Sequence, residues 1–248
     1  MTSDPAAPTD RPDRGDHGGA PTTTVHLVRH GESVWNRHHR VQGQTAQVPL
    51  TPLGHRQAEA AAASLAHRPV RALVTSDLLR TRQTAEHLAA RLGLAPLVDP
   101  AFREQDLGRL QGCHLEGPLG AGTVAEEIQR LWLEPGAAPP FGESLVRLVD
   151  RTAAALADLA ARHDGGEVVV VTHGGPIRVA RALADDPCAS YVPRIPIANG
   201  SIHSLRVPVP AGPPGDTGSG GGPGRPRGTR PTSLVGLTRA PGPPRCPG

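Results

Sequence analysis

The run Glu167–Thr172, with the sequence EVVVVT, is the feature that most limits what this chain can fold into. Four consecutive valines leave no polar face, whereas a strand with one face in water alternates apolar and polar residues. A strand buried on both faces is typical of a parallel sheet that helices cover on both sides. The rest of the chain must therefore supply further strands and the helices that cover them.

Strands and helices alternate along the sequence. Runs rich in β-branched and apolar residues predict further strands or short extended pieces at 23–29, 71–76, 95–98 and 201–207. Ala-rich or amphipathic segments predict helices at 55–65, 77–92, 126–132, 144–163 and 175–184. Asp77 is expected to cap the second helix and Gly93 to end it. This order predicts an α/β fold, a three-layer α/β/α sandwich with a mostly parallel central sheet.

The two ends of the chain differ in composition from its middle. Much of the total of 30 Gly and 28 Pro falls in residues 1–20 and 208–248, where no apolar periodicity is visible. Such segments cannot bury enough apolar surface to offset the entropy of the chain. We therefore predict disordered tails at 1–20 and 208–248 and a single folded domain at 21–207.

The positive charge of the chain lies mainly in its C-terminal segment. The formal net charge is +3, and residues 208–248 contribute +4 from five Arg and one Asp. All 26 basic residues are Arg, which we interpret as GC-rich coding bias rather than as selection for a phosphate-binding surface. The charge is therefore weak evidence for a nucleic-acid partner, and we expect none.

Neither a membrane segment nor a cysteine framework is indicated. No apolar run approaches the length of a membrane span, and the N-terminus lacks the apolar region of a signal peptide. The cysteines, at positions 113, 188 and 246, lie too far apart for a CxxC metal site and predict no disulfide framework. We expect a bacterial, cytoplasmic protein with no membrane partner, either a monomer or a homodimer.

Charged and polar residues follow the predicted strands at the point where each strand ends. Arg29 and His30 end the first strand, and the second leads to Arg80. The valine run leads to His173 and Gly174, and Glu104 follows the short extended piece. Because ligands collect beyond the carboxyl ends of parallel strands, we expect these side chains to converge on one edge of the sheet.

This set of residues suits the chemistry of a phosphate ester. Arg side chains are planar forks that bind phosphate oxygens in pairs. Gly174, at the start of a predicted helix, lets backbone amides approach the same phosphate. A histidine between two arginines has its charged form disfavoured, so His30 stays neutral and nucleophilic and can attack phosphorus. Glu104 can protonate the leaving oxygen and then activate water, and His173, if protonated, can stabilise the phosphate oxygens. We expect neither a metal ion nor a cofactor, since arginine and histidine supply the positive charge.

Five ordered segments resemble one family. RHGESVWN (29–36), PLTPLGHRQA (49–58), SDLLRTRQTA (76–85), EQDLG (104–108) and THGG (172–175) resemble the phosphoglycerate-mutase-like branch of the histidine phosphatase superfamily. The resemblance implies His30 as the nucleophile, a phosphate pocket of Arg29, Arg80 and His173, and Glu104 as the general acid and base. It also implies that Asn36 reaches the phosphate, although Asn36 could instead cap a helix. We expect the substrate to be a small phosphorylated metabolite.

One departure from the resemblance bears on the reaction. The similar mutases carry Glu-Arg-x-Tyr-Gly at the acid position, whereas this chain reads EQDLG from Glu104 and lacks the Arg and Tyr that hold a carboxylated substrate. This departure favours a phosphatase over a phosphoglycerate mutase. A third hypothesis is a non-catalytic phosphate-binding module. The presence of all five pocket residues argues against it.

Some polar residues are open to other readings. Glu104 has other acids nearby in the sequence, namely Glu116, Glu126 and Glu127. Glu143 and Ser144 are expected to start the long helix rather than to contact substrate. Three histidines could suggest a metal site, at positions 26, 38 and 39. We expect all three to lie on the surface instead.

Overall fold

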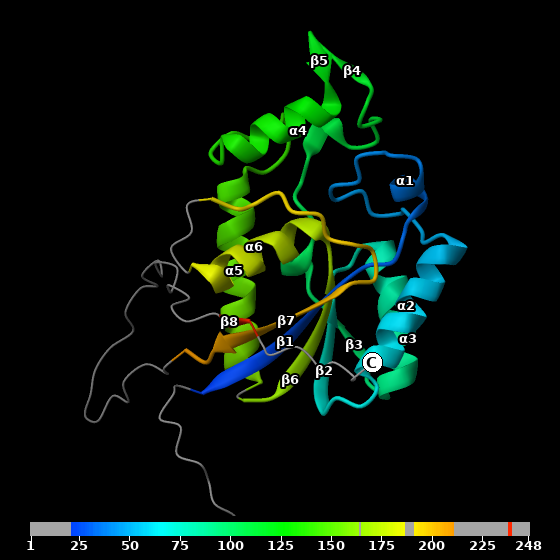
Figure 1. Ribbon diagram of the computed structural model, residues 1–248, viewed down its shortest axis with the longest axis vertical. Helices are drawn as coiled ribbons and strands as arrows, with labels where there is room; N and C mark the ends of the chain where they lie inside the picture. Colours follow the sequence, from blue (N-terminus) through cyan, green and yellow to red (C-terminus); the bar gives the residue numbers. More distant parts are fainter. Residues whose placement is uncertain (1–20, 164, 187–190, 211–237, 240–248) are drawn as a thin grey trace, which may run out of the picture.

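The computed structural model of the protein describes residues 21–163, 165–186, 191–210 and 238–239 (Figure 1). The predicted tail at 1–20 and most of the predicted tail at 208–248 lie outside these residues. No helix of the described ranges is both long enough and apolar enough to cross a membrane.

A six-stranded sheet forms the centre of the fold, in the order β3-β2-β6-β1-β7-β8. Its strands are β1 (Thr22–Arg29), β2 (Val70–Thr75), β3 (Pro96–Val98), β6 (Glu167–Thr172), β7 (Ile202–Pro208) and β8 (Thr238–Arg239). The first four strands of that order pair in parallel, while β7 and β8 pair in the antiparallel direction. The prediction of a mostly parallel sheet is therefore confirmed. β8 falls inside the segment that the sequence predicted to be disordered, so the sheet extends beyond residue 207.

Helices cover both faces of this sheet (Figure 1). The helices of the described residues are α1 (Val34–Arg37), α2 (Pro52–Leu65), α3 (Leu79–Leu92), α4 (Val124–Leu133), α5 (Leu145–Arg162) and α6 (Gly174–Asp185). One face carries α2 and α3, and the other carries α5 and α6. The predicted three-layer sandwich is confirmed, and the sequence missed only the short α1 among these helices.

β6 shows why the valine run needs two covering layers. Val168 and Val170 pack with residues of α5 and α6, whereas Val169 and Val171 pack with residues of α2 and α3. All four side chains are completely buried. A strand with no polar face is stable only where both faces are removed from water, so β6 lies between β2 and β1 at the centre of the sheet.

Smaller elements lie beyond the carboxyl ends of the parallel strands. They are the 3-10 helices η1 (Pro100–Phe102) and η2 (Gly108–Leu110) and the two-stranded hairpin of β4 (Pro118–Leu119) and β5 (Gly122–Thr123). The hairpin and α4 stand above the sheet in Figure 1. A separate apolar cluster joins α4 to α5 and α6, with Leu131, Trp132 and Leu148 among its buried members. This cluster fixes α4 over the strand ends.

Three residues were predicted to begin or end a helix, and two of these predictions are correct. Gly93 ends α3 with φ 69°, a left-handed conformation that suits glycine. Ser144 caps α5 by accepting a hydrogen bond from the amide of Arg147, as expected. Asp77 does not cap α3, because Leu78 holds the cap position and the Asp77 carboxylate instead forms an ion pair with Arg103.

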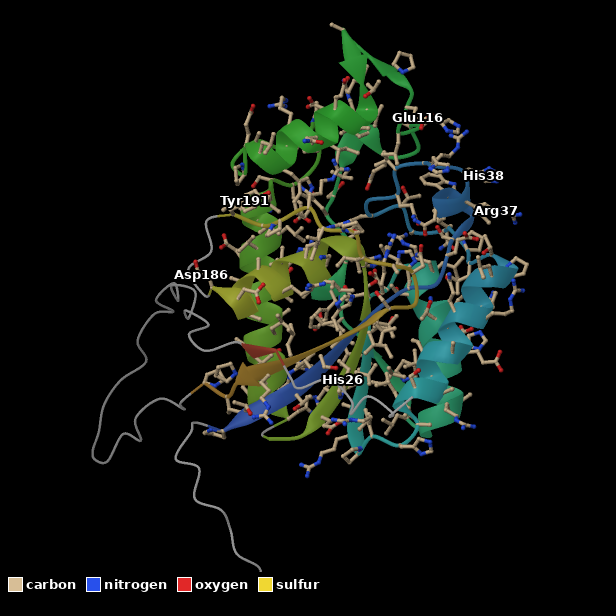
Figure 2. All side chains as sticks on the ribbon, viewed as in Figure 1. His26, Arg37, His38, Glu116, Asp186 and Tyr191 are labelled. Atoms are coloured by element: carbon tan, nitrogen blue, oxygen red, sulfur yellow. The ribbon has the colours of Figure 1, made fainter. Side chains whose placement is uncertain are left out.

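His26 was expected on the surface, but the structure buries it. It lies on the central strand β1 and is only 3% exposed, while His38 is exposed as predicted (Figure 2). The Nε2 atom of His26 lies 3.0 Å from Glu167 Oε2, and Nδ1 lies 2.7 Å from Ser204 Oγ. Because neighbouring strands supply both partners, the buried imidazole is satisfied within the sheet.

Candidate active site

The ends of three strands place the candidate residues next to each other. In the sheet, Arg29 of β1 is level with Thr172 of β6, and Thr75 of β2 is level with Val171. The residues that follow these strands therefore meet at one edge. A pocket at this edge is lined by Arg29, His30, Arg80 and Glu104, four of the five residues proposed from the sequence to carry the chemistry.

His30 is buried and has one ring nitrogen fixed. Its Nδ1 atom lies 2.7 Å from the carbonyl oxygen of Gly31, and since a carbonyl only accepts, Nδ1 carries the hydrogen. In the neutral ring, Nε2 is then the unprotonated nitrogen. Burial lowers the pKa of His30 well below 6.5, and the charges of Arg80 and Arg29 lower it further. His30 is therefore neutral at pH 7, with Nε2 available as a nucleophile.

Backbone carbonyls hold the two arginines, of which Arg80 is buried and Arg29 is half-buried. Arg80, on α3, is fully buried and donates to Thr45 O at 3.0 Å and to Gly43 O at 2.8 Å. Arg29 donates from Nη1 to Ile197 O. Burial lowers the pKa of Arg80 to about 10, against the opposing charge of Glu104, so Arg80 remains a cation at neutral pH. Both guanidinium groups are thus oriented before any ligand arrives.

His173 packs against His30. The centres of the two rings are 5.2 Å apart, and Nε2 of His173 lies 2.8 Å from Ser76 Oγ. Burial lowers the pKa of His173 well below 6.5, and the charge of Arg80 adds to this effect. The imidazole of His173 is therefore neutral in the protein alone. The sequence analysis had considered its protonated form. A bound dianion would favour the protonated form.

Buried polar atoms without a hydrogen-bond partner gather at this site. Among the described residues there are four such side-chain atoms, and three of them are Arg29 Nε, Arg80 Nε and His173 Nδ1. A buried polar atom without a partner costs free energy, so a cluster of them calls for an explanation. A tetrahedral anion with several oxygen atoms would supply the missing acceptors.

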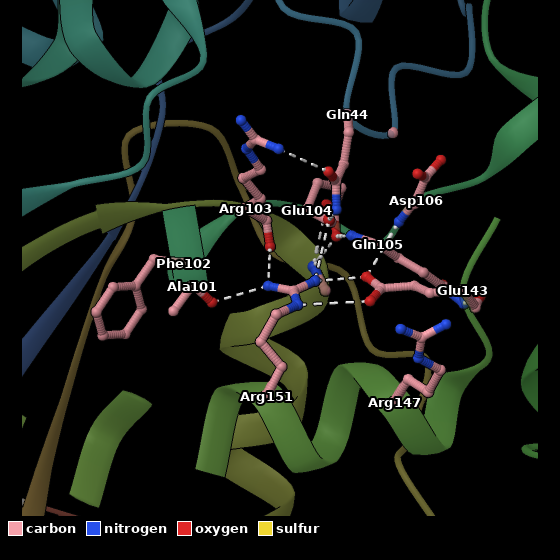
Figure 3. Close-up of polar contacts among 12 residues, drawn as sticks. Gln44, Ala101, Phe102, Arg103, Glu104, Gln105, Asp106, Glu143, Arg147 and Arg151 are labelled. Atoms are coloured by element: carbon pink, nitrogen blue, oxygen red, sulfur yellow. Dashed lines mark hydrogen bonds and ion pairs between the residues drawn. The ribbon is translucent and has the colours of Figure 1, made fainter. Parts of the chain in front are cut away.

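Glu104 is held by backbone amides at the pocket wall (Figure 3). Its carboxylate accepts from the amide of Gly175 at 3.0 and 3.1 Å and from that of Gln105 at 2.9 Å. A Cβ atom at Gly175 would lie 2.1 Å from Glu104 Oε1, so a larger residue there would displace the carboxylate from this position. The first turn of α6 therefore sets the position of the carboxylate.

Arg151 of α5 fixes the backbone that carries Glu104 (Figure 3). Its guanidinium donates to the carbonyls of Ala101, Arg103 and Glu104 at 2.8, 2.9 and 3.2 Å. The same group forms an ion pair with Glu143, the residue that precedes the cap of α5. One side chain thus joins the segment before Glu104 to the long helix.

The alternative acids lie elsewhere. Glu116 is exposed and lies toward the outer hairpin (Figure 2). Glu126 belongs to the capping box of α4, and Glu127 pairs with Arg130 on the same helix. Glu104 is therefore the acid that the structure places in the pocket.

Ser33 is the N-cap of α1, and the Asn36 side chain completes its capping box. Its Oδ1 accepts from the backbone amide of Ser33 at 3.1 Å and from Asn199 at 3.2 Å. The capping alternative is thus observed, and a contact between Asn36 and phosphate stays a prediction. Gly174 is the first residue of α6, directly after the cap residue His173, and its role in phosphate binding also stays a prediction.

Sequence reasoning missed several residues of this site. Arg178 and Arg194 line the same pocket, together with an apolar wall that includes Trp132. Asn199 donates to the carbonyl of His30 at 3.1 Å. The position of Arg178, one turn after Gly174 on the predicted helix, is a signal that could have been used. Arg194 and Asn199 follow no strand end and carry no comparable signal.

The fold and the pocket together define an α/β protein with a buried histidine and arginine cluster suited to phosphate at the carboxyl edge of its sheet. The family model described as histidine phosphatase superfamily (branch 1) matches residues 25–208. The chain belongs to this family, and the resemblance noted in the sequence is confirmed.

The similar proteins include both phosphoglycerate mutases and a phosphatase. The chain is 38% identical over 153 residues to a probable phosphoglycerate mutase GpmB of Yersinia pestis, covering 60% of this chain and 69% of the relative. A mycobacterial glucosyl-3-phosphoglycerate phosphatase, solved with VO3, is 34% identical with a TM-score of 0.64, covering 73% of this chain and 92% of the other. A phosphoglycerate mutase from Thermus thermophilus is 33% identical with a TM-score of 0.54, covering 74% of this chain and 92% of the other.

Proposed function

We propose that this protein is a metal-independent phosphatase that hydrolyses a small phosphomonoester through a phosphohistidine intermediate. The observation that carries the proposal is the cluster of three buried, unpartnered polar atoms around a neutral His30 whose Nε2 is unprotonated. The site holds positive charge for the phosphate and a nucleophile beside it, which are the two requirements of covalent phosphoryl transfer.

In the first step, Nε2 of His30 attacks phosphorus and forms the P–N bond. The bond between phosphorus and the ester oxygen breaks, and the Glu104 carboxylic acid gives its proton to the leaving oxygen. Arg29 and Arg80 hold the equatorial oxygens of the phosphoryl group, with no metal ion in the scheme. His173 contributes a further hydrogen bond, and the charge of the bound dianion favours its protonation.

In the second step, water hydrolyses the phosphohistidine. The Glu104 carboxylate takes a proton from the water, whose oxygen attacks phosphorus. The P–N bond breaks, its electron pair returns to His30 Nε2, and inorganic phosphate leaves. The protein ends in its starting protonation state, so one ester and one water yield one alcohol and one phosphate.

Hydrolysis is favoured over isomerisation for one reason in the sequence. The mutases that this chain resembles use an Arg and a Tyr after the acid to retain a doubly phosphorylated intermediate, and EQDLG lacks both. The similarity to a mycobacterial phosphatase supports the same choice. Phosphoglycerate mutase activity is the second candidate, supported by the name of the Yersinia relative.

The test measures phosphate release and covalent labelling with EDTA present. The wild type is expected to release phosphate from small phosphomonoesters and to yield acid-labile, base-stable phosphate on the protein. His30→Ala should lose both activities, by at least about 1,000-fold for turnover. His38→Ala, an exposed histidine nearby in the sequence, is the matched control and should retain both.

Three results would contradict the proposal. Undiminished turnover by His30→Ala would exclude His30 as the nucleophile. Interconversion of 2- and 3-phosphoglycerate faster than phosphate release would make the protein a mutase. Absence of any turnover, with phosphate binding retained, would indicate the non-catalytic module.

A further inference from the structure

Two histidines of the helical layer formed by α2 and α3 face each other. His55 lies near the start of α2 and His87 in the second half of α3. The two helices lie side by side (Figure 1), and small residues such as Ala61, Ala62 and Ala85 form part of their common apolar cluster. Nδ1 of His55 lies 3.1 Å from Nε2 of His87, and the rings meet edge-on with centres 5.3 Å apart. Helix packing thus brings together two ring nitrogens from residues 32 positions apart.

In the absence of an ion, a hydrogen bond accounts for this contact. One of the two facing nitrogens carries the hydrogen and the other accepts it. Both side chains are only half-buried, so small solutes can reach the pair from the solvent. Histidine is the commonest metal ligand in proteins, and here two imidazoles are held together by the fold.

The separation of the two nitrogens also suits a metal ion. With metal–nitrogen distances of about 2.0–2.1 Å, nitrogens 3.1 Å apart subtend an angle of about 95–102° at the ion. This angle lies between about 90° for a square-planar site and about 109° for a tetrahedral one. The hydrogen between the rings would move to the opposite nitrogen of its own ring, so a neutral pair releases no proton. A small rotation of the rings then directs both lone pairs at one ion.

The surroundings of the pair supply charge but no third close ligand. Glu59, one turn after His55, and Arg91, one turn after His87, line a hollow together with His87. Among the residues that the structure describes, no three His, Cys, Asp or Glu side chains lie close enough together to hold a metal ion. Water would therefore complete the coordination, as it does at metal sites with open positions.

We infer that His55 and His87 bind a divalent transition-metal ion of the Zn²⁺ or Ni²⁺ kind, which ties α2 to α3. Imidazole nitrogen suits these ions, whereas Mg²⁺ and Ca²⁺ prefer oxygen ligands. Neither histidine lines the pocket that holds His30, so the ion takes no part in phosphoryl transfer. The inference is therefore independent of the proposed function.

The two helices that the ion would join also support the segment after the nucleophile. The amide of Gly31 donates to Thr84 Oγ1 of α3 at 3.1 Å, and the amide of Glu32 donates to Gln57 Oε1 of α2 at 2.7 Å. An ion held between α2 and α3 would stabilise this support. Because an ion that binds the folded protein better than the unfolded chain shifts the folding equilibrium, the melting temperature should rise with its concentration.

The test is a calorimetric titration with Ni²⁺, after EDTA has been removed by dialysis. Ni²⁺ is the probe because a free thiol such as Cys113 competes more strongly for Zn²⁺. The wild type is expected to bind Ni²⁺ and to melt at a higher temperature in its presence. His55→Gln and, separately, His87→Gln should each weaken binding by at least about 10-fold and remove the gain in Tm. His67→Gln, at an exposed position just after α2, is the matched control and should behave as the wild type.

Three results would overturn the inference. A wild-type Kd for Ni²⁺ weaker than about 1 mM would leave only a hydrogen bond between the helices. Equal affinity of the wild type and both glutamine variants would place the ion elsewhere on the chain. Binding that is lost in His30→Ala but kept in both glutamine variants would place it in the phosphate pocket.

Two further measurements separate the metal site from folding and from catalysis. Melting without metal shows whether each variant is folded, and glutamine keeps a hydrogen-bonding group at both positions. Release of phosphate from p-nitrophenyl phosphate in EDTA should be unchanged in His55→Gln and His87→Gln. A failure of the metal site therefore leaves the proposed phosphatase activity intact, and a failure of that activity leaves the metal site intact.

Discussion

Removing the Arg151 guanidinium tests whether α5 positions the general acid. Arg151→Met keeps most of the apolar stem but leaves three backbone carbonyls without their donor and the Glu143 carboxylate without its cation. The Arg151 and Glu143 side chains are 22% and 12% exposed. The interaction is therefore largely, but not completely, removed from water.

The expected loss of stability follows from this burial. Breaking a buried ion pair by removing one partner costs about 3–5 kcal/mol, and the residual exposure places this case near about 3 kcal/mol. For a domain of this size each kcal/mol lowers Tm by about 2–4 °C, so the melting temperature should fall by about 6–12 °C. Arg147→Met, an exposed position one turn away on the same helix, is the matched control and should change Tm by less than about 2 °C.

A positioning role also predicts a particular loss of activity. If Arg151 acts through Glu104, an alkyl phosphate, whose leaving oxygen needs a proton, should lose about 10- to 100-fold in kcat. p-Nitrophenyl phosphate, with a stable phenolate as leaving group, should lose much less. Steady-state kinetics on both substrates, below the melting temperature of the variant, gives the comparison.

The reasoning would be refuted by either of two results. Arg151→Met with the same Tm as Arg147→Met would show that the contacts in Figure 3 contribute no net stability. An equal loss of kcat for the alkyl and the nitrophenyl ester would show that Arg151 does not act through the general acid. Glu143→Gln provides an independent check, because it removes the partner charge and should reproduce the same substrate dependence in weaker form.

Two further predictions concern Glu104 and His30. Gly175→Ala places a Cβ atom 2.1 Å from Glu104 Oε1, so it should lower kcat for alkyl phosphates by at least about 10-fold, whereas Gly136→Ala, with open space around the added carbon, should not. Because burial, then Arg80 and Arg29, lower the pKa of His30, the free protein keeps this imidazole neutral as the pH falls through 6.5. The acid limb of the kcat/KM profile, corrected for ionisation of the substrate, should therefore lie below pH 6.5, and a limb at 6.5 or above would contradict the environment described for His30.

The sheet and its edge could be predicted from local patterns. The valine run of β6 and the alternation of strands with helices report burial along the chain, and burial on two faces leaves few folds open. The strand ends then indicated where Arg29, His30 and His173 would meet, because parallel strands share one carboxyl edge. Arg80 and Glu104 were found in the same way, and the structure places both at the pocket.

Other features depend on which elements pack together. The Arg151 contacts join residues about 50 positions apart, and Arg194 reaches the pocket from a segment with no strand-end signal. Asp77 had a plausible capping position but pairs with Arg103, which lies 26 residues away. Sequence periodicity describes which residues share a face of one element, and it does not predict contacts between residues that are distant in the sequence.

The sequence by itself determined the layered fold, the order of its strands along the chain and the edge where chemistry can occur, because hydrophobic periodicity and strand direction are local properties. Only the tertiary structure decided that His26 is buried, that His173 is neutral, and that four arginines share one pocket. Those properties depend on desolvation and on charges brought together from distant segments, and neither exists until the elements have packed.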